Sequence, residues 1–260
     1  MHPEMLRLEI DARGVATLTL ARPDKHNAMN AQLIDELAWA AGELSTRPAR
    51  AAVLAAEGRS FSAGGDLAWM RAQMEADRAT RMAEARRLAA MLGRLDAVPV
   101  PLIARVQGQA FGGGLGLMAV ADVVIAAEGV MLGFTETRLG LIPATIGPYV
   151  AARMGPRIRT VFASARPFDA AEGVRLGLVS RVVAAEALDE AVEAEIAPCL
   201  KVAPGAAGRA KGLLRSLGLA VSEAAVETSI TALADQWETE EAEQGIAAFF
   251  DRRPTPWSAP

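Results

Sequence analysis

Two glycine-rich stretches are the segments best suited to chemistry. "FSAGGDL" spans residues 61–67, and "FGGGLGLMA" spans residues 111–119 with glycines at 112, 113, 114 and 116. At a predicted helix start, glycine leaves backbone N–H groups accessible. Two such groups aimed at one point can hold a carbonyl oxygen as it becomes negative, and the helix dipole strengthens that field. The pattern favours chemistry through an enolate or a tetrahedral anion.

The second stretch also fits the dinucleotide fingerprint G-x-G-x-x-G/A, with Glu136 following twenty residues after Gly116. In nucleotide-binding domains a strand runs directly into the first glycine. Here "QGQAFGG" separates the predicted strand "LIARV" from Gly114. Close packing of a helix against a strand is the plain structural alternative for such glycines. We therefore favour anion stabilisation over nicotinamide binding.

Composition narrows the class of protein. The chain has 260 residues, of which 52% are hydrophobic and 22% charged, as in soluble globular proteins. A net charge of -4 argues against a nucleic-acid-binding protein. With one cysteine, Cys199, and two histidines, we expect no disulfide framework and no metal site. The N-terminus has no signal core, and the longest apolar run contains Asp122, so we expect a cytoplasmic protein with no membrane span.

Strand and helix patterns position the two stretches. A helix is predicted after Asn30 as N-cap, and a long helical region runs from Leu67 to about Leu95 with a break near Asp77. The last sixty residues read as almost wholly helical. The alternation of strands and helices in the first two thirds predicts βα units. The predicted strands are "LRLEI", "VATLTL", "AAVLAA", "LIARV" and "DVVIAA".

In order and spacing, seven segments resemble the crotonase, or enoyl-CoA hydratase/isomerase, superfamily over essentially the whole chain. They are "LARPDKHNAMN", "GRSFSAGGDLAWM", "VPVPLIARVQGQAFGGGLGL", "ADVVIAAE", "FTETRLGLIPA", "FDAAEGVRLGLVSRVV" and "GIAAFFDRRPTPW". The segments "ETRLGLIPATIGPYV" and "SAGGDLAWM" look like the branch that hydrates methylglutaconyl-CoA and isohexenylglutaconyl-CoA in leucine or acyclic-terpene breakdown.

The resemblance implies an α/β fold, a crotonase-like spiral of ββα units. We expect residues 1–197 to form this catalytic core and residues 198–260 to form a helical region that builds a homotrimer or a dimer of trimers. The implied activity is hydration of an α,β-unsaturated acyl-CoA thioester. The resemblance implies no separate cofactor, because coenzyme A is part of the substrate.

The resemblance also implies site residues. The oxyanion hole falls on the backbone N–H groups of Gly65 and Gly113. The expected coenzyme A contacts are Arg22, Lys25 and His26 for phosphate, Ala28 near the adenine and pantetheine, and Ala63.

One departure from the family pattern concerns the mechanism. Family hydratases commonly use two glutamates around one water, but here Gly116 stands at the first position and only Glu136 at the second. Three alternatives follow: hydration with Glu136 as the lone acid and base, isomerisation of a 3-enoyl-CoA to the 2-enoyl form by one glutamate, or a non-catalytic acyl-CoA-binding or protein-binding member. Glu136 as a lone acid and base requires a pKa raised by an apolar pocket.

Arg138 is a candidate for substrate recognition. It lies two residues after Glu136, so in an extended segment both side chains face the same way. A glutaconyl-type ester carries a distal carboxylate, which arginine can hold by two hydrogen bonds. The alternative is that Arg138 pairs with an acid elsewhere in the protein.

Overall fold

The larger of two sheets forms the centre of the molecule. The structure, a computed structural model, describes residues 2–258. The strand order is β1-β2-β3-β5-β7-β10, and only β1 and β2 are antiparallel neighbours. Every residue of β3 is buried, as expected for a parallel strand covered on both faces. The strands are β1 (Leu6–Ile10), β2 (Val15–Leu20), β3 (Ala51–Ala56), β5 (Leu102–Val106), β7 (Val123–Ala127) and β10 (Arg181–Val183).

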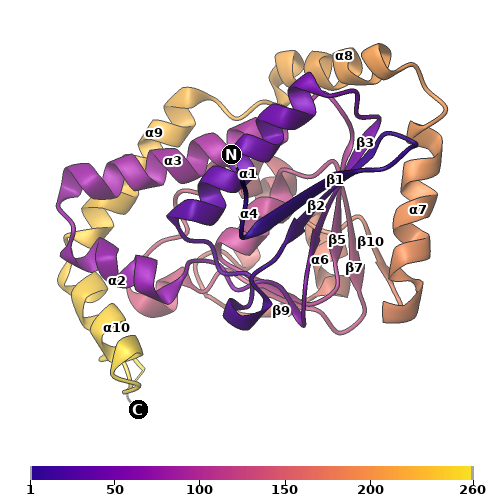
Figure 1. Cartoon of the computed structure of the whole chain (residues 1–260). Coiled ribbons are helices and arrows are strands. Elements are labelled where there is room, and N and C mark those ends of the chain that lie inside the picture. The colour runs from indigo at the N-terminus through magenta and orange to yellow at the C-terminus, as the bar shows by residue number, and fades with distance from the viewer. Residues whose placement is uncertain (1, 259–260) are drawn as a thin grey trace.

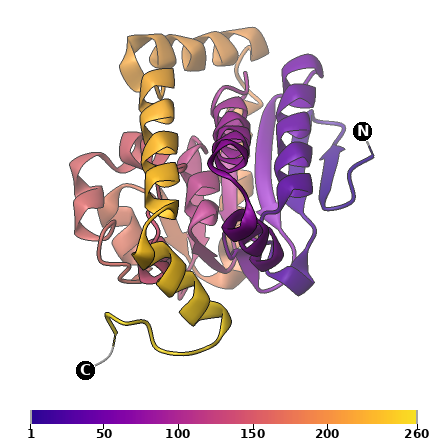
Figure 2. The same ribbon diagram turned by 90° about the vertical axis from the view of Figure 1, so that its left-hand side faces the viewer.

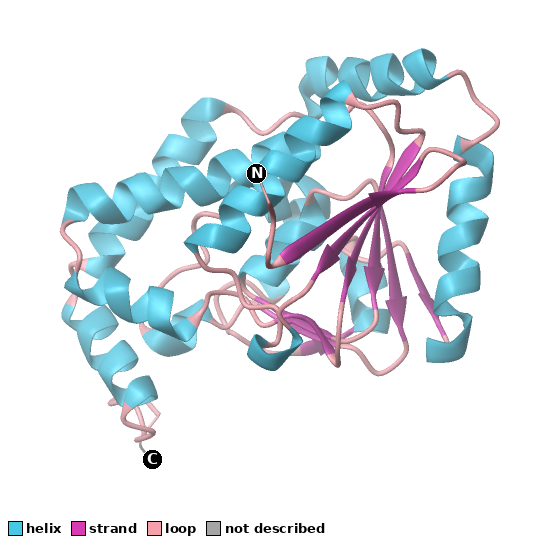
Figure 3. Ribbon diagram, in the orientation of Figure 1, coloured by secondary structure: helices cyan, strands magenta, loops and turns pink. Residues whose placement is uncertain are grey.

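A smaller sheet crosses the lower part of the view in Figure 3. It contains the parallel strands β4 (Ser60–Ser62), β6 (Gln109–Phe111) and β8 (Met131–Gly133), with β9 (Phe168–Asp169) antiparallel at its edge. The three parallel strands follow β3, β5 and β7 and precede α2 (Leu67–Glu75), α4 (Gly113–Ala119) and the 3-10 helix η2 (Glu136–Leu139). This repeated order confirms the predicted α/β fold of ββα units.

Two helices begin at the capping residues that the sequence predicts. Asn30 accepts a hydrogen bond from the N–H of Leu33 at the start of α1 (Ala31–Thr46). Asp77 accepts one from the N–H of Thr80 at the start of α3 (Arg78–Asp96), which confirms the predicted break. Helices α1 and α3 lie on one side of the larger sheet and α7 (Leu188–Cys199) on the other (Figure 1).

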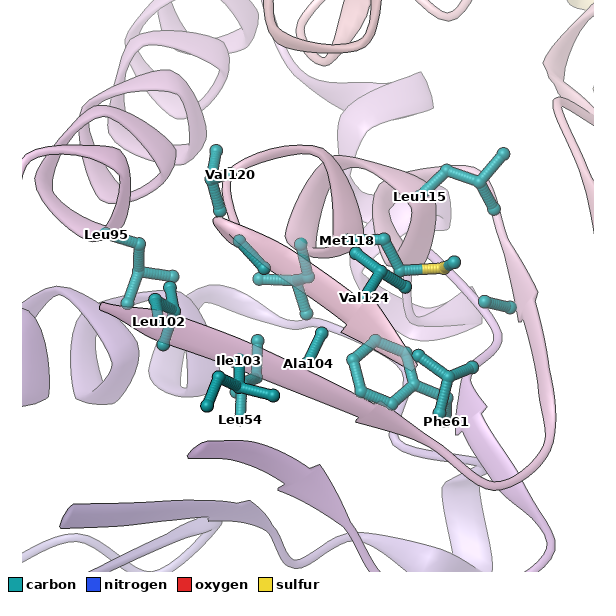
Figure 4. Close-up of a cluster of buried hydrophobic side chains, with 14 of the residues drawn as sticks. Leu54, Phe61, Leu95, Leu102, Ile103, Ala104, Leu115, Met118, Val120 and Val124 are labelled. Atoms are coloured by element: carbon teal, nitrogen blue, oxygen red, sulfur yellow. The ribbon is translucent and has the colours of Figure 1, made fainter. Parts of the chain in front are cut away.

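The core lies between the larger sheet and the helices. Figure 4 shows Leu102 and Ala104 of β5 below Met118 of α4, with Phe61 of β4 beside them. All four side chains are fully buried. This packing fixes the C-terminal ends of β4 and β6, from which the two glycine-rich loops begin.

The C-terminal helices α9 (Glu223–Trp237) and α10 (Glu240–Phe250) pack against helices and a loop that precede them in the chain. Figure 2 shows α9 running along the molecule below α8 (Pro204–Leu214), with α10 beneath. Ile230 of α9 packs on α3, and Ile246 of α10 packs on Leu141 in the loop after η2. The other helices are η1 (Pro23–Lys25), α5 (Gly147–Met154), η3 (Gly155–Thr160), α6 (Ala170–Leu176), η4 (Ala185–Ala187) and the π-helical turn η5 (Arg215–Leu219).

Two further expectations concern this region. The division at residue 197 and its role in assembly stay predictions. Among residues 2–258, no single helix has the length and apolar character of a membrane span. The segments Pro204–Leu219 and Glu223–Trp237 have that length and character only when taken together, and a bend of 64° separates them.

Candidate active site

The three parallel strands of the smaller sheet bring the predicted chemical groups together. Gly65 follows β4, Gly113 follows β6 and Glu136 follows β8. Because neighbouring parallel strands end at the same sheet edge, these residues converge although they are far apart in sequence. A Cβ atom added to Gly112 would lie 2.8 Å from Oε1 of Glu136, so the carboxylate lies directly against the second glycine loop.

The two glycine loops touch through their backbones. Gly64 has φ 90° and Gly112 has φ 48°, in the region that glycine adopts without strain. A Cβ on Gly64 would lie 2.9 Å from the carbonyl oxygen of Phe111. Side chains would separate the loops, which explains the small residues on both sides.

The backbone N–H groups of Gly65 and Gly113 are free to bind a ligand. Neither donates a hydrogen bond to the backbone of residues 2–258. Gly113 is the first residue of α4, where a helical N–H has no partner within the helix. Gly65 precedes Asp66, which caps α2 by accepting hydrogen bonds from Ala68 and Trp69.

An outer cleft and an inner cavity meet at these groups. The outer cleft has a volume of about 1060 Å³ and the inner cavity about 130 Å³. Gly65, Gly113 and Glu136 line both. The cavity is otherwise mostly apolar, with walls from α2, α3, α9 and the loop 141–146. A ligand that occupies both spaces must therefore place its central part beside the two N–H groups and the carboxylate.

Burial changes the acidity of Glu136. Its Oε2 atom is fully buried and has no hydrogen-bond partner among the described residues, although part of the side chain faces the cleft. Loss of solvation raises the pKa of the carboxyl from 4.5 to about 7, against a smaller opposing effect of nearby backbone groups. A carboxyl with this pKa can both accept and donate a proton near neutrality.

Hydrocarbon fills the space beside Gly116, where the family pattern has another acid. A Cβ atom on Gly116 would lie 2.6 Å from Cγ2 of Ile146 and 3.4 Å from Cδ1 of Leu92. Both neighbouring side chains belong to the buried core. Gly116 is thus a packing glycine, and a longer side chain there requires its neighbours to move.

The predicted coenzyme A contacts all line the outer cleft, namely Arg22, Lys25, His26, Ala28 and Ala63. Lys25 is exposed on η1. Nδ1 of His26 lies 2.9 Å from the hydroxyl of Ser60. Arg22 is less available, because it forms an ion pair of 3.0 Å with Asp66, and both side chains are 12% exposed. A phosphate contact of these residues stays a prediction.

The segment around Arg138 is not extended, so the condition under which Arg138 and Glu136 would face the same way is not met. Residues Glu136–Leu139 form a 3-10 helix, which closes at Gly140 with φ 69°. Arg138 is exposed and lines the outer cleft but not the inner cavity. α10 lies against Gly140, since a Cβ there would overlap the carbonyl of Glu241. Whether Arg138 contacts substrate stays a prediction.

Sequence reasoning missed three residues at the inner cavity: Arg81, Ile146 and Trp237. Arg81 lies in the helical region predicted from Leu67 to about Leu95, and Trp237 lies in the last sixty residues, which read as almost wholly helical. Trp237 lies on α9, and this helix closes the cavity. The packing of α9 on α3, which is a tertiary contact, brings Arg81 and Trp237 to the cavity. Ile146 reaches it from the start of α5.

No group of three or more His, Cys, Asp or Glu side chains within residues 2–258 is arranged to hold a metal ion.

The chain is similar to known proteins over nearly its whole length. The family described as "Enoyl-CoA hydratase/isomerase" matches residues 11–260. A Mycobacterium tuberculosis protein named "Probable enoyl-CoA hydratase echA8" is 34% identical over 257 residues, covering 97% of each chain. The crystal structure of an enoyl-CoA hydratase from Shewanella pealeana has a TM-score of 0.80 and 35% identity, over 98% of this chain and 96% of that one. Pseudomonas aeruginosa AtuE has a TM-score of 0.78 and 34% identity, over 98% and 100%.

Proposed function

We propose that Glu136 is the single acid and base of this chain, which belongs to the enoyl-CoA hydratase/isomerase family and is an enzyme of the enoyl-CoA hydratase type. The observation that carries the proposal is the position of Gly65, Gly113 and Glu136 at the junction of cleft and cavity. The thioester lies at this junction, with coenzyme A in the cleft and the acyl chain in the cavity.

The proposed hydration proceeds through an enolate. The Glu136 carboxylate takes a proton from water as the water oxygen bonds to the β-carbon. The electron pair of the double bond moves to the thioester oxygen, which accepts hydrogen bonds from the N–H groups of Gly65 and Gly113. The protonated carboxyl then returns its proton to the α-carbon, so that one water is added and Glu136 is regenerated. A pKa of about 7, caused by burial, suits a group that works in both directions.

Isomerisation is the second candidate, favoured by the packing at Gly116. Ile146 occupies the space where a second carboxylate would help to hold water. Moving a double bond requires only one base, which carries one proton between two carbons of the same substrate. The names of the similar proteins support hydration, whereas this packing supports isomerisation.

We propose further that the acyl group is branched or glutaconyl-type, the class of ester formed in leucine or acyclic-terpene breakdown. The sequence segments that resemble this branch support the proposal, as does a cavity of about 130 Å³ with both apolar and charged lining residues.

We also propose that the chain assembles as a homotrimer or a dimer of trimers through its C-terminal region. Leu213, Leu214, Leu217 and Leu219 are all exposed within seven residues of α8 and η5. Exposed apolar side chains at this density are typical of an interface.

Glu136→Gln tests the acid–base proposal. The variant keeps the shape of the side chain and removes its basicity, so we expect turnover of crotonyl-CoA to fall by about two to four orders of magnitude. Loss of the enoyl thioester absorbance measures hydration, and formation of that absorbance from a 3-enoyl-CoA measures isomerisation.

Labelled water distinguishes the two candidate reactions in the wild-type enzyme. Hydration predicts that oxygen from labelled water enters the product, whereas isomerisation predicts an unlabelled product. Near-normal turnover by the Glu136→Gln variant would exclude Glu136 from either mechanism, and inertness of the wild-type enzyme toward all enoyl-CoA esters would favour a non-catalytic binding role.

A further inference from the structure

The wall of the inner cavity contains a guanidinium that forms no direct ion pair with a carboxylate of residues 2–258. Arg81 of α3 lines the cavity together with Trp69, Glu84 and Trp237. Its guanidinium lies 5.3 Å from the ring centroid of Trp237. Other acids lie nearby without a direct ion pair. Arg81 also borders a groove lined by Glu75, Glu238, Glu240 and Glu243. Its charge adds to the hydrogen bonds from Thr80 that lower the pKa of Asp77.

The carboxylate in the same cavity wall is already satisfied. Glu84 accepts a hydrogen bond of 3.1 Å from Nε1 of Trp69 and another of 3.2 Å from Arg87. Arg87 also pairs with Asp35. Glu84 is therefore hydrogen-bonded but shares the charge of Arg87 with Asp35, and Arg81 is the one cation among the described residues that line the cavity.

Arg81 has hydrogen-bond donors to spare. Its Nε donates to the carbonyl of Gln73 at 2.8 Å, and its Nη2 donates to the carbonyl of Met74 at 2.9 Å. A guanidinium carries five N–H groups, so these two bonds leave the other three available. The carbonyls fix the guanidinium between α2 and α3, and Trp237 fixes its plane. A fixed planar donor is suited to a carboxylate, which it can bind through two parallel bonds.

We infer that Arg81 is a specificity residue that binds a carboxylate at the distal end of the acyl chain. The inference rests on the proposed function, because it takes the inner cavity as the acyl site. An isolated carboxylate would be costly to bury in an apolar cavity, and Arg81 removes that cost. The preferred substrate class is thus a dicarboxylic enoyl-CoA ester.

Arg81 is better placed for this role than Arg138. Arg81 lines the inner cavity, while Arg138 is exposed in the outer cleft, on the coenzyme A side of the junction. The distal end of an acyl chain whose thioester lies at Gly65 and Gly113 extends away from the outer cleft.

The test compares two enoyl esters with the intact enzyme. The readout is the ratio of kcat/KM for glutaconyl-CoA, or a longer dicarboxylic homologue, to kcat/KM for crotonyl-CoA. We expect Arg81→Met to lower this ratio by about 30-fold or more, the cost of leaving a buried carboxylate without its cation. Arg81→Lys, which keeps the charge but loses the fork, is expected to retain part of the ratio.

Arg71→Met is the matched control. Arg71 also stacks on an aromatic ring, 4.5 Å from the centroid of Phe250, but it does not line the cavity. Its replacement is expected to leave the ratio at the wild-type value. An unchanged ratio in Arg81→Met, or a fall of the ratio in Arg138→Met instead, would overturn the inference.

Two further measurements complete the test. Binding of saturated esters does not depend on catalysis, and a modified substrate for the wild-type enzyme does not depend on the folding of a variant. Calorimetry with the saturated esters glutaryl-CoA and butyryl-CoA is expected to give weaker binding of glutaryl-CoA alone in Arg81→Met. If that variant does not fold, wild-type enzyme is compared on glutaconyl-CoA and its terminal carboxamide, and we expect a preference of about tenfold or more for the carboxylate. Equal use of both esters contradicts the inference. Selective glutaryl-CoA binding without hydration contradicts the proposed function and leaves the inference standing.

Discussion

At the scale of single residues, Glu136 combines two demands on one carboxyl. The smaller sheet holds it against Gly112, and the surrounding chain buries its Oε2 without a partner. The fold therefore accepts an unfavourable burial at the position where the proposed chemistry needs a proton carrier. Groups whose burial costs stability but shifts their pKa toward a useful value are typical of functional sites.

This burial has a consequence for stability that pH reveals. Because burial raises the pKa of Glu136 from 4.5 to about 7, the folded state binds more protons than the unfolded state between these values. The free energy of unfolding should then fall as pH rises through this window. Relative to Glu136→Gln, wild-type enzyme should lose about 3 kcal/mol by the time the pH is above both pKa values.

Denaturant titrations of both proteins at a series of pH values, at one fixed protein concentration, measure this difference. Below the unfolded pKa, both proteins are uncharged at this position and their difference should be constant. A constant difference across the whole pH range would contradict the raised pKa.

Residue patterns predicted part of the site and missed the rest for a physical reason. Gly65, Gly113 and Glu136 belong to local segments whose residue types are unusual, so they can be identified from the sequence. Their convergence on the cleft agrees with the positions expected, and their roles stay predictions. Arg81 carries no such local signal, because an arginine on an amphipathic helix is usually solvated and only the packing of α9 encloses it.

At the scale of elements, α4 and the start of α5 determine which acids the site can hold. Gly116 of α4 faces Ile146, the N-cap residue of α5. The helix pair therefore packs through a glycine where the family pattern has a catalytic acid. A variant with carboxylates at both positions would need compensating changes in α4 and at the start of α5.

A double-mutant cycle tests this contact. Gly116→Ala should lower the free energy of unfolding by about 1–3 kcal/mol, because its Cβ atom overlaps Ile146 and overpacking forces neighbours aside. In an Ile146→Ala background the same change should cost less, with a coupling energy of at least about 0.5 kcal/mol.

Gly42→Ala provides the control, since a Cβ atom on Gly42 meets nothing within 4 Å. It should not be coupled to Ile146→Ala. Additive effects of Gly116→Ala and Ile146→Ala would mean that the two helices can separate without cost, and the second acid's absence would then need another explanation.

The elements themselves were predictable where local signals are strong. Asn30 and Asp77 mark helix starts by side-chain caps, and the apolar run "AAVLAA" marks a buried strand. The strands β4, β6 and β8 have only three residues each, too few for a periodic pattern, and the resemblance alone implied them. The turn at η2 is also too short for a periodic pattern, and it closes at Gly140, where α10 lies against the chain.

At the scale of the whole molecule, α8 and η5 present leucines that the described chain does not cover. Leu217 is 72% exposed and Leu213 is 57% exposed. Burying them between subunits would remove apolar surface from water, at roughly 25 cal/mol per Å². This exposed cluster supports the proposed assembly through the C-terminal region.

Replacing both Leu213 and Leu217 by Lys should shift the sedimentation coefficient from that of a trimer or hexamer to that of a smaller species. Val174→Lys is the control, because Val174 is also exposed, at 40%, but lies on α6. An unchanged sedimentation coefficient for the double variant would place the subunit contact elsewhere.

The inner cavity is closed by Trp237 and Leu233 of α9, whereas the loops after β4, β6 and β8 supply the chemical groups. The loops line part of the cavity too, but α3 and α9 line it without supplying any of the three proposed chemical groups. In the proposed arrangement, mutations in the codons for α3 and α9 change the acyl site while Gly65, Gly113 and Glu136 are inherited intact. A lineage with this architecture can then acquire new substrates by drift in its helices.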